Sequence, residues 1–127
     1  MVKAVQQFML GTVMNTEEQA ADTMANMKAA GYDGIELCGF MLHPSSLMVR
    51  LMTKAAGMPV GRGGRLPWPR LVKDSGLKVV SLHCDLGSVE RSPAAVAGEA
   101  LSFGTDKIVI TGMYRFPYGE AEAVKEL

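Results

Sequence analysis

The stretch Gly76-Leu-Lys-Val-Val-Ser-Leu-His-Cys-Asp-Leu86 has the pattern of a buried parallel strand that ends in polar residues. A short apolar, β-branched run follows Gly76, and a glycine in that place is typical of the end of a preceding helix. The run places His83 where the strand passes into a loop. Ligands of α/β folds gather at the carboxyl ends of parallel strands, because loops open there and helix N-termini point there. His83 is therefore a candidate for chemistry, and a histidine that is merely hydrogen-bonded within the sheet is the alternative.

The composition is that of one globular domain over residues 1–127, with 48% hydrophobic and 20% charged residues. Thirteen Lys and Arg balance thirteen Asp and Glu, so the net charge gives no electrostatic footprint for nucleic acid or an anionic membrane. No apolar run approaches the roughly 20 residues of a membrane span. Cys38 and Cys84 are too few for a disulfide framework, so we expect reduced thiols in a cytoplasmic protein.

Strand and helix patterns alternate along the chain. We expect further strands at about residues 3–9, 32–39 and 105–112, and helices that begin after Thr16, near Trp68, at Ser92-Pro93 and near Glu120. The helices that lead into the second, third and fourth strands each stop at a glycine, namely Gly31, Gly76 and Gly104. Regular alternation with buried strands predicts an α/β fold with a parallel sheet and right-handed crossovers.

Residues 39–70 are the least regular part. We expect an apolar turn at 40–44, then a short helix that begins at Ser45 or Ser46 and stops at Gly57. The Gly- and Pro-rich segment that follows should be mostly loop. Its Arg62 and Arg65 could wrap a phosphate or carboxylate, but a solvent-exposed connection explains them too.

Glu36 is the unusual member of the second strand. A carboxylate inside a buried strand needs a partner or an aqueous pocket. Either Glu36 points into a polar site, or it faces a surface helix and pairs with a lysine; the cost of burying a charge favours the site.

Four segments together resemble the N-terminal half of a sugar phosphate isomerase/epimerase of the xylose-isomerase-like TIM-barrel superfamily. These are Thr16-Glu-Glu-Gln, Met27-Lys-Ala-Ala-Gly-Tyr-Asp-Gly-Ile-Glu-Leu37, Ser75-Gly-Leu-Lys-Val-Val-Ser-Leu-His83 and Phe103-Gly-Thr-Asp-Lys-Ile-Val-Ile110. The resemblance covers most of the chain outside about residues 40–70. It implies about four of the eight parallel (β/α) units of a TIM barrel, a half barrel, since a complete barrel takes about 250 residues.

The resemblance also implies roles for single residues. His83 and Glu36 correspond to residues that line the barrel mouth and contact the substrate, so both are catalytic candidates, and Gln6 lies in a similar lining position. Tyr114, in an aromatic loop, is a candidate to stack on a sugar ring, although a packed loop would explain it equally well. The family's divalent metal is bound by residues of later strands, so no residue of this chain is assigned to it.

Three functions remain open at this point. The first is metal-assisted proton transfer next to the carbonyl of a sugar or sugar phosphate, in a complete barrel. The second is a non-catalytic half barrel that forms a homo-oligomer through its open sheet edges. The third, a nuclease similar to the apurinic endonucleases of the superfamily, would need a basic surface, which zero net charge disfavours.

Overall fold

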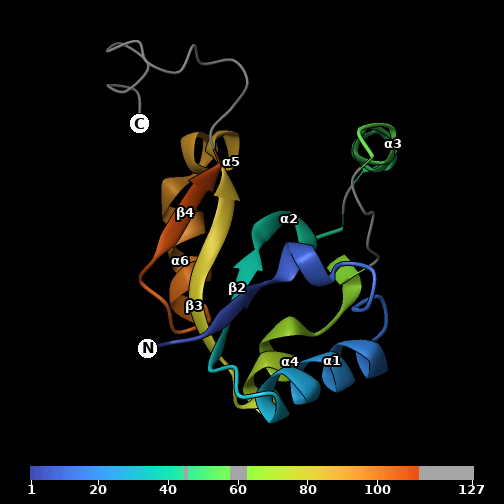
Figure 1. Cartoon of the computed structure of the whole chain (residues 1–127). Coiled ribbons are helices and arrows are strands. Elements are labelled where there is room, and N and C mark those ends of the chain that lie inside the picture. Colours follow the sequence, from blue (N-terminus) through green and yellow to red (C-terminus); the bar gives the residue numbers. More distant parts are fainter. Residues whose placement is uncertain (45, 58–62, 112–127) are drawn as a thin grey trace.

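A computed structural model of the chain describes residues 1–44, 46–57 and 63–111 (Figure 1). Tyr114 and the helix expected from Glu120 lie outside these residues. The elements, in chain order, are β1 (Ala4–Gln6), η1 (Gln7–Leu10), α1 (Glu17–Ala29), β2 (Gly34–Cys38), α2 (Gly39–Leu42), α3 (Leu47–Ala55), η2 (Gly63–Arg65), α4 (Trp68–Ser75), β3 (Lys78–Asp85), α5 (Leu86–Arg91), α6 (Pro93–Ser102) and β4 (Ile108–Thr111).

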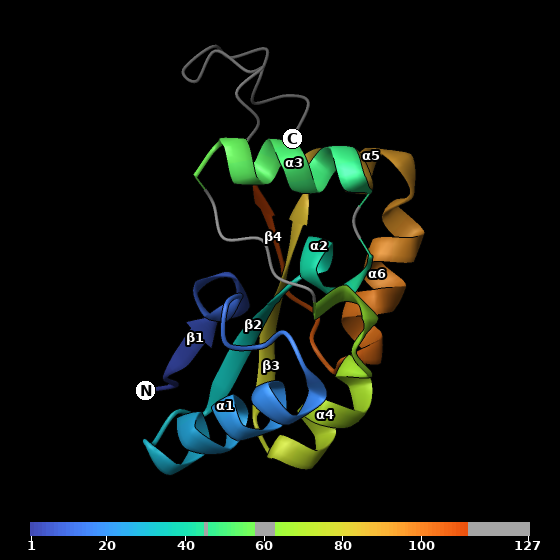
Figure 2. The same ribbon diagram turned by 90° about the vertical axis from the view of Figure 1, so that its right-hand side faces the viewer.

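The four strands form one parallel sheet in the order β1-β2-β3-β4. The α/β class and the parallel sheet predicted from the sequence are therefore confirmed. When parallel strands follow one another in sequence order and every crossover has the usual right hand, all crossover helices fall on the same face of the sheet. Residues of α1, α4 and α6 share one buried cluster with β2 and β3, and Figure 2 shows α1 in front of the strands with α4 and α6 to their right.

The core lies between this face and the helices. Ile35, Leu37 and Leu82 project from β2 and β3 and are fully buried. Met24 of α1 and Trp68 of α4 pack over them, in the same cluster as Val96 and Ala100 of α6. The apolar side chains of the central strands are thus used to hold the helices, which leaves the polar ones for the opposite face.

A bulge in β3 decides which side chains reach that opposite face. Ile35 pairs with Val79, but the next residue, Glu36, pairs with Ser81, so β3 contains one extra residue at Val80. Val79 and Leu82 both belong to the core, while the two residues between them do not. The bulge therefore turns Ser81 and His83 to the sheet face from which Glu36 projects. Bulges beside functional sites commonly redirect side chains in this way.

The predicted helix ends are confirmed. Gly31, Gly76 and Gly104 have φ angles of 89°, 71° and 80°, the left-handed conformation that a glycine adopts without strain. The Oγ1 of Thr16 accepts a hydrogen bond from the Gln19 N–H at 3.1 Å, and Ser92 caps α6 by accepting one from the Ala95 N–H at 3.4 Å.

Several boundaries predicted from the sequence were wrong. The first strand ends at Gln6 and not near residue 9, because the Gln7 side chain accepts a hydrogen bond from the Cys38 N–H at 2.9 Å and the chain coils into η1. The segment after β3 is α5 and not a loop, since Asp85 caps its N-terminus. The apolar turn at 40–44 contains α2, and β4 begins at Ile108 and not at 105.

Gly34 and Gly98 give a matched test of the packing around the bulge. A Cβ on Gly34 would lie 2.6 Å from the Lys78 carbonyl oxygen and 2.7 Å from Val80 Cγ1, whereas one on Gly98 in α6 would meet nothing within 4 Å. We predict that Gly34→Ala lowers the free energy of unfolding in urea by about 1–3 kcal/mol, as overpacking does. Gly98→Ala should raise it by about 0.5–1 kcal/mol through helix propensity. Equal effects of the two changes would contradict the close approach at Gly34.

Candidate functional site

Gln6, Glu36 and His83 lie together on the sheet face that the helices leave free. Gln6 pairs with Glu36 across β1 and β2, and Cys38 pairs with His83 across β2 and β3. Each of the three is at or near the carboxyl end of its strand, where loops can surround a ligand. The three residues that the sequence singled out on these strands are therefore in direct contact.

Three neighbouring side chains surround the Glu36 carboxylate. Gln6 Nε2 donates to Glu36 Oε1 at 2.6 Å, and Ser81 Oγ donates to Oε2 at 2.6 Å. His83 Nδ1 lies 3.2 Å from Oε1. The Glu36 side chain keeps 20% of its exposure, so it is half-buried but not sealed from water. Glu36 thus points into a polar site, and the alternative of a lysine partner on a surface helix was wrong.

These contacts keep Glu36 ionised. Burial raises the pKa of the Glu36 carboxyl, but hydrogen bonds from Ser81 and Gln6, together with the hydrogen bond and the charge of His83 when its ring is protonated, outweigh burial and hold that pKa below its usual value. At neutral pH the site therefore contains a fixed negative charge beside an imidazole. A carboxylate–histidine pair of this kind can orient the ring and balance a positive charge that develops on it.

The geometry also assigns the proton on neutral His83. The Gln6 amide nitrogen is 2.6 Å from Glu36 Oε1 and 2.9 Å from His83 Nδ1, so its two N–H groups can serve both acceptors. Nδ1 is then an acceptor, and the ring proton resides on Nε2. If the ring becomes an imidazolium, Nδ1 gains a proton that can be donated to Glu36 Oε1. His83 can thus change between its two forms without losing a partner at Nδ1.

Thr111 of β4 completes the network on the other side of the ring. His83 Nε2 is hydrogen-bonded to Thr111 Oγ1, and that hydroxyl can donate in turn to the Cys84 carbonyl oxygen at 3.4 Å. Sequence reasoning missed both Thr111 and Ser81 as site residues. Ser81 could have been found only by locating the bulge, and Thr111 only by knowing its register with Asp85.

Gln7 and Cys38 line the same ends of β1 and β2. Gln7 is fully buried, and its Nε2 is without a hydrogen-bond partner among the residues described. Burial raises the pKa of the Cys38 thiol to about 11, and burial likewise raises that of Cys84 to about 11. Both thiols are free, and at neutral pH they are protonated and unreactive.

The other residues considered from the sequence lie elsewhere or outside the described residues. His43 is 63% exposed and its Nε2 lies 2.6 Å from Glu99 Oε1, which fits a surface position. Arg65 is exposed at the end of η2. Arg62 and Tyr114 fall in the segments that the structure does not describe.

The residues present do not fit a metal site of their own. Within residues 1–44, 46–57 and 63–111, no three His, Cys, Asp or Glu side chains are grouped to hold a metal ion. Glu36 and His83 alone supply two donors, and Ser81 and Gln6 already occupy the carboxylate.

No helix in the described ranges has both the length and the apolar character needed to cross a bilayer.

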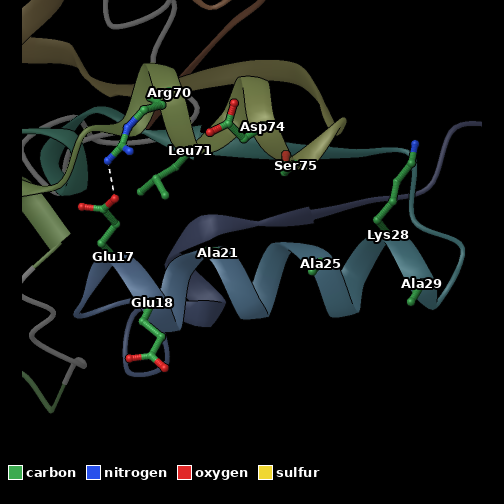
Figure 3. A pocket seen from close by; sticks show the side chains of 10 residues that line it. All are labelled: Glu17, Glu18, Ala21, Ala25, Lys28, Ala29, Arg70, Leu71, Asp74 and Ser75. Carbon is green, nitrogen blue, oxygen red and sulfur yellow. Dashed lines mark hydrogen bonds and ion pairs between the residues drawn. The ribbon is translucent and has the colours of Figure 1, made fainter.

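A separate groove of about 840 Å³ lies between α1 and α4, on the helix side of the molecule (Figure 3). Ala21, Ala25 and Ala29 of α1 line it along one side, and Glu17 is paired with Arg70 of α4 at one end. We call this the α1–α4 groove. It contains none of the polar cluster around Glu36.

Comparison of the chain with protein-family models, with curated proteins and with solved structures found no match. The function must therefore be argued from the site itself.

The lowered pKa of Glu36 predicts a pH dependence of stability. A carboxyl whose pKa is depressed by folding stabilises the protein above its unfolded-state value of 4.5, and this stabilisation is lost as the pH falls through the folded-state value. We predict that the difference in free energy of unfolding between wild type and Glu36→Gln shrinks as the pH is lowered from about 5 to 3. Chemical denaturation at each pH measures it, and titrations elsewhere cancel in the difference. A difference that stays constant over this range would show that Glu36 is not stabilised as an anion.

Proposed function

We propose that this chain forms the N-terminal half of a (β/α) barrel that moves a proton at a carbon next to the carbonyl of a sugar or sugar phosphate. The observation that supports it is the hydrogen-bonded cluster of Gln6, Glu36 and His83 at the carboxyl ends of three adjacent parallel strands. Barrel enzymes place their active sites at these ends. The strand order β1-β2-β3-β4, with the core helices on one face, is the order that such a barrel requires.

The polar cluster supplies the proposed proton transfer with a hydrogen-bond donor, His83, and with a carboxylate, Glu36, that balances charge on it. His83 is held in one orientation, with its Nε2–H directed at the Thr111 hydroxyl, where an oxygen of the substrate can take the place of that hydroxyl. A hydrogen bond from Nε2 to a carbonyl or hydroxyl oxygen stabilises the negative charge that develops when the neighbouring carbon loses its proton. Glu36 balances any positive charge that the ring acquires, and Gln6 positions both groups.

The divalent metal expected for the family has no site among the described residues of this chain. In the complete barrel it would be held by residues of other strands, and it would polarise the substrate oxygens. The roles of His83, Glu36 and Gln6 do not depend on their binding the metal. Tyr114 remains a proposed sugar-stacking residue, and a cytoplasmic location is supported by two free thiols.

His83→Asn tests this function, and His43→Asn is its matched control. In the full-length protein supplied with divalent metal, we predict that His83→Asn lowers turnover of ketose and ketose phosphate substrates by about 10²–10⁴-fold, the usual contribution of a positioned acid–base group. His43→Asn should leave turnover unchanged, because His43 is an exposed surface residue. Exchange of solvent deuterium into the carbon next to the carbonyl measures the step directly. Equal exchange rates in wild type and His83→Asn would remove His83 from the site.

A second candidate function is self-association through the sheet edges without catalysis. β1 and β4 are the edges of the described sheet, each with a row of backbone groups that another strand could pair. Ile108, Val109 and Ile110 of β4 are 37–39% exposed, which is unusual for three consecutive β-branched residues of a parallel sheet. Two copies that paired β1 with β4 of the other would give an eight-stranded assembly. This second function predicts a homo-oligomer without catalytic activity, whereas the first predicts turnover once the active site is complete.

A further inference from the structure

The helix α3 exposes its entire apolar side. Leu47, Met48, Leu51 and Met52 are 59–72% exposed, and no residue of α3 is buried. Their spacing places them side by side along one stripe of the helix. Figure 1 shows α3 standing apart from the sheet. Large apolar stripes left open in this way mark surfaces that bind another molecule.

The charge on α3 has one sign. The helix contains Arg50 and Lys54 and no acidic residue. The sequence around it continues the pattern, since no Asp or Glu occurs between Leu37 and Lys73. A surface that covers α3 should therefore combine an apolar floor with carboxylates at its border.

The α1–α4 groove has this combination. Its floor on α1 is made by three exposed alanines one turn apart, which let another helix approach closely. Glu18 of α1 and Asp74 of α4 stand at its border, as Figure 3 shows, and neither is in an ion pair with a described residue. Arg70 is already engaged by Glu17. Lys28, the other cation of the lining, donates to the Gly76 carbonyl oxygen at 3.3 Å. Glu18 and Asp74 are therefore the carboxylates left to face the two cations of α3.

The dimensions of the two surfaces also agree. At about 1.5 Å per residue, the nine residues of α3 span about 13.5 Å, which is shorter than the 13-residue helix α1 that provides the alanine floor. An amphipathic helix laid in an apolar groove is a recurring mode of recognition.

We propose that α3 of one copy of this chain docks in the α1–α4 groove of a second copy, with Leu47, Met48, Leu51 and Met52 on the alanine floor and Arg50 and Lys54 beside Glu18 and Asp74. The contact joins two different surfaces, so it is heterologous and each copy offers one helix and one groove. It involves neither the polar cluster nor the strands β1 and β4. It is therefore independent of the proposed catalytic function and of pairing at the sheet edges.

Sedimentation velocity of the full chain over a range of concentrations tests the proposal. Wild type should associate, and Leu51→Asp on α3 or Ala25→Arg on the groove floor should each weaken association tenfold or more. Both positions are on the surface, so neither change removes a core contact. Val49→Asp is the matched control: it adds the same charge to the same helix, outside the apolar stripe, and should leave association close to that of wild type.

Mixing the two variants makes the test specific. The Leu51→Asp chain keeps an intact groove, and the Ala25→Arg chain keeps an intact α3, so the mixture should form a 1:1 complex at concentrations where each variant alone stays monomeric. A wild-type chain that stays monomeric would overturn the proposal. Association that is equal in wild type and both variants would also overturn it, and would instead support pairing through β1 and β4.

Discussion

The half-buried carboxylate of Glu36 is the constraint on which the polar face of this sheet depends. A carboxylate on a central strand must either lose its charge or be surrounded by donors. Here Gln6 of β1 and Ser81 of β3 each donate at 2.6 Å, and His83 Nδ1 of β3 lies 3.2 Å away, where it can donate when the ring is charged. The three strands are thus connected through one anion, in addition to their backbone hydrogen bonds, and the orientation of His83 follows from it.

The bulge at Val80 makes this arrangement possible. In a regular strand, Val79, Ser81 and His83 would all project to one face. With one extra residue, Val79 stays in the core while Ser81 and His83 face Glu36. Without the extra residue, apolar side chains of β3 would project from the sheet face that carries Glu36. One inserted residue therefore separates a face that packs against helices from a face that can bind a ligand.

The sequence was sufficient to predict the order of the elements and part of the site. Glycines at 31, 76 and 104 and the caps at Thr16 and Ser92 are local signals, and the structure has them where they were expected. The contact between Glu36 and His83 followed from the rule that parallel strands end at one edge. The early end of β1 and the roles of Ser81 and Thr111 depend on contacts between residues far apart in the chain, and no local pattern contains these.

The central claim is that Gln6, Glu36 and His83 share one face and one hydrogen-bond network. The ¹⁵N resonances of the neutral His83 ring test it most directly. We expect this form to have an unprotonated Nδ1 and a protonated Nε2, with the Nδ1 resonance moved by Gln6→Leu and by Glu36→Gln. An Nδ1 resonance that neither substitution moves would place these side chains apart and would contradict the account.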